Sequence, residues 1–164
     1  MSQKKSSPVK KEVKDLVQEN GPSLINSANY IKDLSFENPG VLKDFSDGQT
    51  SPELNINVHV DVTPVGEHVY EVVLMLKAAA NHHKEALFLL ELSYGGIFRV
   101  DESFGDDERK RMLLIDAPSL LFPFARTIVA NLTREGGLPP LLLNPVNFED
   151  MYRQTVNEET KLKH

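Results

Sequence analysis

Strict alternation of apolar and polar residues predicts a β-strand over residues 53–63. Leucine, isoleucine and valine occupy every second position from Leu54 to Val62, and polar side chains lie between them. Because successive side chains of a strand point to opposite faces, this segment offers one face to a core and the other to solvent. Similar patterns, bounded by turn-forming residues, predict three more strands over residues 29–37, 69–80 and 85–100.

The four predicted strands form one antiparallel sheet. Short turns at residues 64–66 and 81–84 join the last three strands in order, and such connections favour antiparallel neighbours. The last strand contains Gly95 and Gly96, which predict a bulge or a close approach of another part of the chain.

Helices are predicted in the second half of the chain. A central helix over residues 119–135 has Pro123 in its first turn, and Gly136-Gly137 end it. A shorter helix is predicted over residues 106–115, and an amphipathic helix begins near Pro145, after a crossover segment. Strands followed by helices indicate an α+β fold, a four-stranded antiparallel sheet with C-terminal helices packed on one face.

The predicted domain occupies residues 28–157. The Lys-rich segment 1–27 is expected to be a flexible arm, and the charged segment 158–164 a mobile tail.

Apolar side chains surround most of the central helix, including Phe124 and Ile128. A helix that packs on one sheet needs only an apolar stripe. The second apolar surface is therefore predicted to come from another copy of the chain, which makes the protein an oligomer.

The composition favours a protein partner over nucleic acid. The 164 residues carry a formal net charge of −6, whereas binding to phosphates requires a basic face. The chain has no cysteine, so disulfides, thiolate metal sites and cysteine nucleophiles are excluded. The polar N-terminus lacks the apolar core of a signal peptide, and no uninterrupted apolar run reaches the roughly 18 residues of a membrane span. We expect a cytoplasmic protein.

Catalytic and metal-binding patterns are weak in this sequence. His59 and Asp61 share a strand face, but no nearby spacing supplies a third ligand. His82-His83 lies in a predicted turn, and the acidic run 106–108 lacks the alternation of a calcium loop. We therefore expect a protein that is not an enzyme, although a small hydrolase or isomerase that uses His59 and Asp61 remains an alternative.

A possible protein-binding patch lies on the last strand. Leu87 and Leu89 share a face with Glu91, and exposed leucines beside an acid are typical of interaction surfaces. The alternative is that both leucines are packed under a loop.

Several separated blocks of the sequence resemble the SecB family of protein-export chaperones. The resemblance covers residues 30 to about 152. It is carried by YIKDLSFE at 30–37, VYEVVL at 69–74, FLLE at 88–91, GGIF at 95–98, LFPFAR at 121–126 and PLxLxPVNF at 140–148.

The resemblance implies a homotetramer, a dimer of dimers, that needs no cofactor or metal. It implies a holdase that keeps unfolded precursors competent for translocation and delivers them to the SecA ATPase. A chaperone of the same fold dedicated to one client, such as an antitoxin, is the alternative.

The resemblance also assigns residues to three surfaces. The SecA-docking surface comprises Asp33, Glu37, Leu89 and Glu91. The client groove comprises Leu141, Leu143, Phe148 and Met151. The oligomer interface comprises Leu90, Leu92, Tyr94, Phe124 and Ile128.

Overall fold

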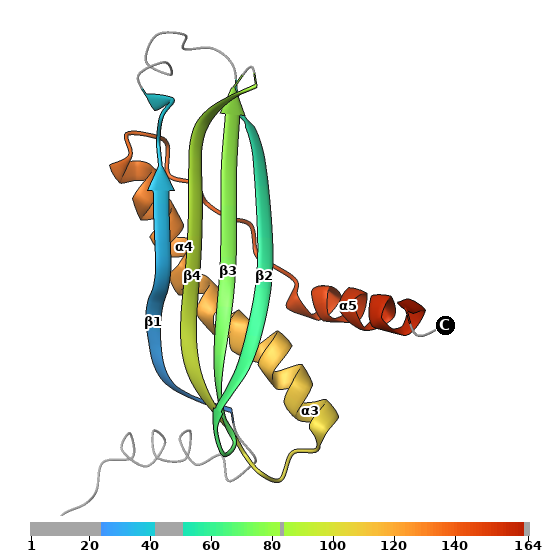
Figure 1. Cartoon of the computed structure of the whole chain (residues 1–164). Helices are drawn as coiled ribbons and strands as arrows, with labels where there is room; N and C mark the ends of the chain where they lie inside the picture. Colours follow the sequence, from blue (N-terminus) through green and yellow to red (C-terminus); the bar gives the residue numbers. More distant parts are fainter. Residues whose placement is uncertain (1–23, 42–50, 83, 163–164) are drawn as a thin grey trace, which may run out of the picture.

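The computed structural model describes residues 24–41, 51–82 and 84–162, and contains one antiparallel sheet of four long strands (Figure 1). The strands are β1 (Leu24–Glu37), β2 (Glu53–Gly66), β3 (Val69–His82) and β4 (Glu85–Val100). Their order across the sheet is β1-β4-β3-β2. The predicted fold class is confirmed.

The first strand is longer than the sequence pattern indicated. β1 begins at Leu24 and pairs with β4 from Leu24↔Val100 to Glu37↔Leu89. Residues 24–27 therefore belong to the sheet and not to the predicted arm, and residues 1–23 lie outside the described residues. Alternation is hard to see at this end because register shifts occur between Asn26 and Ala28 and between Ile31 and Asp33.

One continuous helical body follows the sheet. It comprises α3 (Asp106–Arg111), the π-helical segment η1 (Met112–Asp116) and α4 (Ala117–Glu135). The predicted break before residue 119 is wrong. Pro123 lies in the helix interior instead of the first turn, and it removes one backbone N–H donor there.

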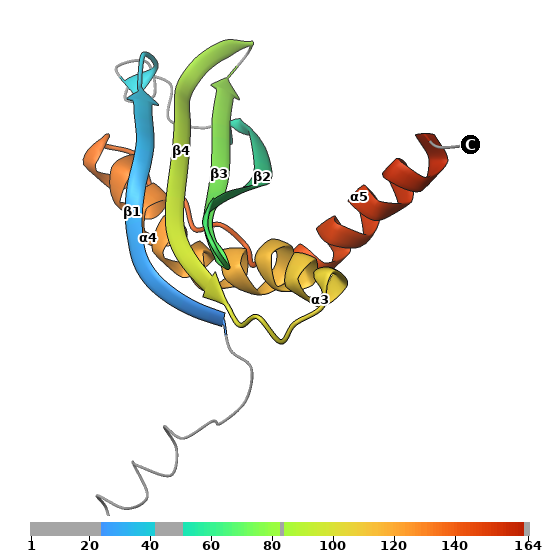
Figure 2. The same cartoon turned by 60° about the horizontal axis from the view of Figure 1, so that its bottom comes forward.

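The core lies between α4 and one face of the sheet (Figure 2). Residues of the two central strands, such as Leu74 and Leu92, are buried against Leu121, Ala125 and Val129 of the helix. Burial of such side chains contributes about 1.5–3 kcal/mol each.

By length and composition alone, the continuous helix 106–135 could also cross a membrane. This differs from the expectation based on uninterrupted apolar runs. Because Leu121, Ala125 and Val129 of α4 are fully buried in the core, we interpret it as the core helix of a folded domain.

The helix end and the crossover segment that follows are fastened together. Gly137 has φ +78°, and the amides of Gly137 and Leu138 donate to the carbonyls of Arg134 and Thr133, as in a Schellman motif. The Thr133 side chain is buried and accepts a bond from the Leu141 amide at 2.9 Å. Arg126 Nε donates to the Leu143 carbonyl at 2.7 Å.

The last helix, α5 (Phe148–Leu162), extends away from the body of the molecule (Figures 1 and 2). Residues 158–162 of the predicted tail thus continue a helix. Only its first residue, Phe148, is buried, and the Phe148 ring packs edge-on against Phe122 with 6.2 Å between centroids.

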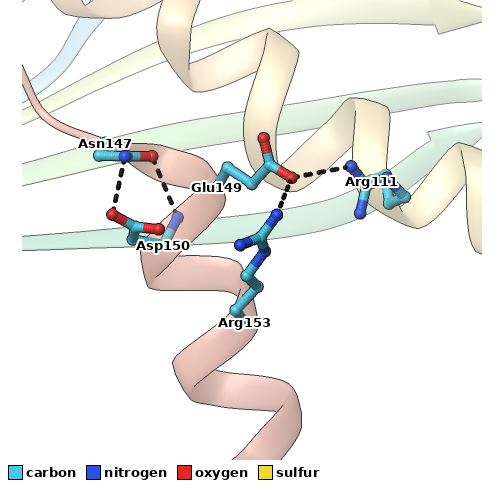
Figure 3. Close-up of polar contacts among 5 residues, drawn as sticks. All are labelled: Arg111, Asn147, Glu149, Asp150 and Arg153. Atoms are coloured by element: carbon cyan, nitrogen blue, oxygen red, sulfur yellow. Dashed lines mark hydrogen bonds and ion pairs between the residues drawn. The ribbon is translucent and has the colours of Figure 1, made fainter.

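Polar contacts at the base of α5 tie it to the neighbouring helical body (Figure 3). Glu149 contacts Arg111 at 3.3 Å and Arg153 at 2.9 Å. Two hydrogen bonds lower the pKa of Glu149 below the usual glutamate value: the one from Arg153 has the larger effect and the one from Arg111 the smaller. Asn147 caps the helix by accepting from the Asp150 amide at 3.1 Å.

Candidate functional site

The open face of the sheet brings together the four residues predicted to form a docking surface. In the β1–β4 register, Glu37 is opposite Leu89, and Glu91 is opposite Ser35, two positions from Asp33. Asp33 and Glu37 are exposed, while Leu89 is half-buried. Three carboxylates thus share the β1–β4 part of this face with Leu89, Glu37 directly opposite it and Asp33 two rows further along.

A lysine that the sequence reasoning did not consider pairs with this surface. Lys77 of β3 is the cross-strand neighbour of Glu91, and its Nζ lies 2.6 Å from Glu91 Oε1. Period-two alternation on β3 could have placed Lys77 on the open face, but only the strand register shows which carboxylate it meets.

A second polar cluster crosses the same face nearby. Tyr30 Oη donates a hydrogen bond to Glu71, and Lys32 Nζ lies 2.7 Å from the other oxygen of that carboxylate. Burial, followed by the hydrogen bond to Glu71, raises the pKa of Tyr30 to about 12. Lys32 and Tyr30 lower the pKa of Glu71, so its charge is already compensated within the protein.

The predicted close approach at the glycine pair is confirmed. The Tyr30 ring lies across Gly95, where a Cβ would come within 2.7 Å of it. A Cβ at Gly96 would meet Leu121 of α4 at 2.8 Å on the helix side. The absence of side chains therefore allows both layers to pack closely on β4.

The expected leucine pair on the open face is only partly present. A register shift between Ala80 and Asn81 leaves Leu87 without a partner on β3, and Leu87 is buried. Such a bulge alters the side-chain alternation, so Leu87 does not share an open patch with Leu89. The alternative, that both leucines are packed under a loop, holds for Leu87, which is buried, and only partly for Leu89, which is half-buried.

An apolar cleft of about 320 Å³ lies between the crossover segment and the end of the sheet near Leu54. Among the described residues the lining is apolar, and it comes from β2, β3, β4, the residue before β2 and the crossover. The lining comprises Pro52, Leu54, Ala80, Leu87, Phe88, Leu138, Pro139, Pro140 and Leu141.

The predicted client-groove residues divide into two groups. Leu141 lines the cleft. Leu143 and Phe148 do not line this cleft and are packed in the protomer core, at 4% and 3% exposed. Met151 is half-buried against the core and does not line this cleft. The sequence reasoning missed Leu54 because periodicity does not show which sheet edge the crossover passes.

The cleft continues as an apolar strip along the inner face of β2. Leu54 and Ile56 are 40% and 42% exposed. A second hollow of about 290 Å³ lies beside Val62, between β2 and the helical body, and its lining is mixed: Val62, Leu113 and Leu114 with the charged Asp106, Arg109 and Lys110. Leu54 and Val62 are eight residues apart, about 27 Å along a strand. β2 is also an edge strand, so one side of its backbone is unpaired within the protomer.

The predicted oligomer-interface residues fall into a buried group on β4 and a more exposed group on α4. Leu90 and Leu92 are 0% and 1% exposed within a single chain, so they belong to the protomer core and their assignment to a surface is wrong. Tyr94 is buried beneath Phe124, with 6.3 Å between stacked rings. Phe124 is 53% exposed, while Ile128 is half-buried.

No group of three or more metal-ligating side chains is present within residues 24–41, 51–82 and 84–162. His59 Nε2 lies 3.0 Å from Asp61 Oδ1, and both side chains are exposed. The acidic run at 106–108 forms the first turn of α3, where Glu108 accepts from the Gly105 amide. The His59–Asp61 pair is therefore a surface contact, and the acidic run at 106–108 caps the start of α3.

Comparison with known proteins shows which family of proteins the chain resembles. A family model described as preprotein translocase subunit SecB matches residues 17–159. The protein-export protein SecB of Sinorhizobium medicae is 47% identical over 142 residues, which cover 87% of this chain and 84% of the relative. That of Paramagnetospirillum magneticum is 49% identical over 138 residues, covering 84% and 88%.

A solved structure supports the fold. The SecB-like chaperone Rv1957 of Mycobacterium tuberculosis, in complex with a ChAD peptide from the HigA1 antitoxin, matches with a TM-score of 0.58 and 16% identity, covering 75% of this chain and 90% of that chain. The helix-backed sheet is thus the fold of a class of chaperones. Within that class, this chain belongs to the SecB family of protein-export chaperones.

Proposed function

We propose that the protein holds unfolded precursor proteins in the bacterial cytoplasm and delivers them to the SecA translocation ATPase. The observation that carries the proposal is the apolar cleft with its continuation along the edge strand β2. Export, and not service to one antitoxin, is favoured because the relatives at 47% and 49% identity are protein-export proteins.

The cleft suits an extended apolar segment of a client. The described residues of its lining include no charged side chain, so binding against them removes apolar surface from water without burying an unpaired charge. Segments of this kind are exposed in a newly made chain and buried after folding. Selectivity for unfolded clients therefore needs no sequence motif in the client.

The open sheet face is proposed as the surface that docks SecA. Asp33, Glu37 and Glu91 supply negative charge on the same face as Leu89, which suits a basic partner that also makes an apolar contact. This face lies opposite the helix-covered face, so docking and the packing of α4 do not compete for the same side chains (Figure 2).

Four copies are proposed to assemble as a dimer of dimers through α4 and the β1 edge. Ile31 and Leu34 of β1, together with Leu120 and Phe124 of α4, are apolar and between 37% and 53% exposed. Several clefts on one assembly would raise the affinity for a long client, because further contacts become intramolecular after the first.

Native mass spectrometry with a chemically unfolded secretory precursor tests the holdase function. We expect a four-chain species that binds one unfolded precursor and does not bind the same precursor after it has folded. Equal binding of both forms, or of neither, would contradict the proposal.

Glu91→Lys separates docking from client binding. We expect SecA affinity to fall by at least about tenfold, because like charges then meet across the interface, while precursor affinity stays close to the wild-type value. Glu158→Lys on exposed α5 makes the same change in charge outside the sheet face and serves as the control. Equal loss of docking and client binding in Glu91→Lys would show that this assignment is wrong.

A further inference from the structure

Lys77 occupies a central position on the open face of the sheet. The strand registers place Asn57, Lys77, Glu91 and Ser35 in one row across all four strands. The next rows are His59, Met75, Ser93 and Asp33 on one side, and Asn55, Ala79, Leu89 and Glu37 on the other. Together these rows form a field of twelve neighbouring side chains.

This field combines the proposed docking residues with a single permanent cation. Its carboxylates are Asp33, Glu37 and Glu91, and Lys77 is the one lysine or arginine among the twelve positions, all of which the structure describes. Lys32 lies outside the twelve and is engaged by Glu71 at 2.7 Å. Lys77 is therefore the cation that directly opposes the acidic character of the field.

We infer that Lys77 is an internal counter-ion that a basic partner must displace from Glu91. The inference rests on the proposed docking function of this face. In the free protein, Lys77 Nζ lies 2.6 Å from Glu91 Oε1, where a cation of the partner would otherwise bind. Lys77 thus acts as a specificity residue, since it disfavours weakly basic partners that cannot compete for Glu91.

The exposure of the pair makes displacement feasible. The Lys77 and Glu91 side chains are 52% and 46% exposed, and an ion pair in contact with water is weak and sensitive to salt. Lysine also has a flexible stem, so its ammonium can leave Glu91 while the strand stays in place. Docking therefore requires a side-chain movement and no rearrangement of the sheet.

The experiment measures SecA affinity for the full-length protein and for Lys77→Met, which keeps an apolar stem and removes the charge. We expect binding about threefold tighter at low salt, the order expected when one charge about 6 Å from a partner cation is removed at high dielectric. The gain should shrink on going from about 50 mM to about 500 mM salt, because screening shortens the range of the interaction.

Three further variants define the mechanism. Lys77→Arg keeps the charge and should show no gain. Lys110→Met removes an exposed, ion-paired lysine of α3, so a gain there equal to that of Lys77→Met would reveal a general net-charge effect and overturn the inference. In a Glu91→Gln background, Lys77→Met should give a smaller gain, since the carboxylate for which Lys77 and the partner cation compete is absent.

The controls also separate this inference from the function on which it rests. If Glu91→Gln leaves SecA affinity unchanged, the docking surface itself is wrong and the inference falls with it. If Glu91→Gln weakens docking but Lys77→Met does not tighten it, the docking surface stands and the role of Lys77 is overturned.

Discussion

A single buried hydroxyl joins the central helix to the crossover. Thr133 is fully buried. Its hydroxyl donates a hydrogen bond that is shared between the Val129 and Ala130 carbonyls, at 3.0 and 3.1 Å. The hydroxyl oxygen also accepts a hydrogen bond from the Leu141 amide. Since Leu141 lines the apolar cleft, this contact fixes one wall of the proposed client site.

Thr133→Val tests that contact with little change in side-chain shape. Loss of the acceptor leaves the partly buried Leu141 amide without its partner, and we expect the free energy of unfolding to fall by about 1–3 kcal/mol. Urea denaturation followed by circular dichroism measures the change.

Thr127→Val is the matched control for this variant. Thr127 makes a similar bond to the Pro123 carbonyl, at 2.9 Å, on the exposed side of the same helix. We expect its effect to stay within about 0.5 kcal/mol. Equal losses in the two variants would show that the link to the crossover is unimportant.

At the scale of elements, α5 is held mainly by its first turns. Phe148 supplies its buried contact, and Glu149 joins it to Arg111. The Arg111 guanidinium also lies over the Tyr152 ring at 5.7 Å. The outer turns contribute the looser pair of Glu159 with Lys110 at 3.7 Å. The direction in which α5 extends is thus set by the contacts of its base.

Glu149→Gln should loosen α5 without unfolding the domain. We expect amide hydrogen exchange in residues 149–162 to become faster, with exchange in β3 and β4 unchanged, and the difference to decrease in high salt. Glu158→Gln on the same helix is the control. Faster exchange throughout the protein would indicate a general loss of stability instead.

The ion pair of Glu149 with Arg111 makes a contribution to stability that depends on pH. The pKa of Glu149 is lowered in the folded protein. The contribution of this carboxylate to folding stability is therefore fully present above the ordinary glutamate pKa of about 4.3, and it is lost as pH falls through the lower pKa of the folded state. The difference in urea midpoint between wild type and Glu149→Gln should therefore be constant near neutral pH and shrink below about pH 4.

The elements themselves were largely predictable from local pattern, whereas the surfaces were not. Alternation and apolar runs show which face of an element is buried. They do not show what buries it, so Leu90 and Leu92 were assigned to an interface between copies when α4 of the same chain covers them. Leu143 lies in the irregular crossover, which has no periodicity to separate core from surface, and Phe148 is the first residue of α5, so local pattern did not place either side chain.

The four residues proposed for docking lie on one face of the sheet, as predicted, because that arrangement depends only on strand register. Asp33 and Glu37 occupy one face of β1 by alternation, and the antiparallel pairing with β4 brings them beside Leu89 and Glu91. Lys77 was missed because its ion pair depends on β3 lying next to β4, a long-range fact that no local window contains.

At the scale of the whole molecule, one apolar band is left without a cover in the protomer. Phe124 of α4 stacks on Tyr94, whose partner on β1 is the exposed Ile31. Leu34 continues the band along the edge strand. Contiguous apolar surface next to an unpaired strand edge is typical of an interface between copies.

Phe124→Glu should therefore weaken the assembly. We expect the proposed four-chain species to dissociate into smaller ones at micromolar concentration, as measured by native mass spectrometry and size-exclusion chromatography, with protomer secondary structure intact. Leu142→Glu introduces the same charge at an apolar side chain of the crossover that is 61% exposed, and its assembly should be unchanged. A stable tetramer in Phe124→Glu would place the interface elsewhere.

The order of the strands has a consequence for synthesis on the ribosome. Among the described strands β1 pairs only with β4, and Leu24 must wait for Val100, 76 positions later in the chain. At about 5–20 residues per second, the first strand stays unpaired for roughly 4–15 s. Its charged side chains, among them Asp33 and Glu37, disfavour association with other unfinished chains during that interval. The carboxylates proposed for docking in the mature protein thus also protect it while it is being made.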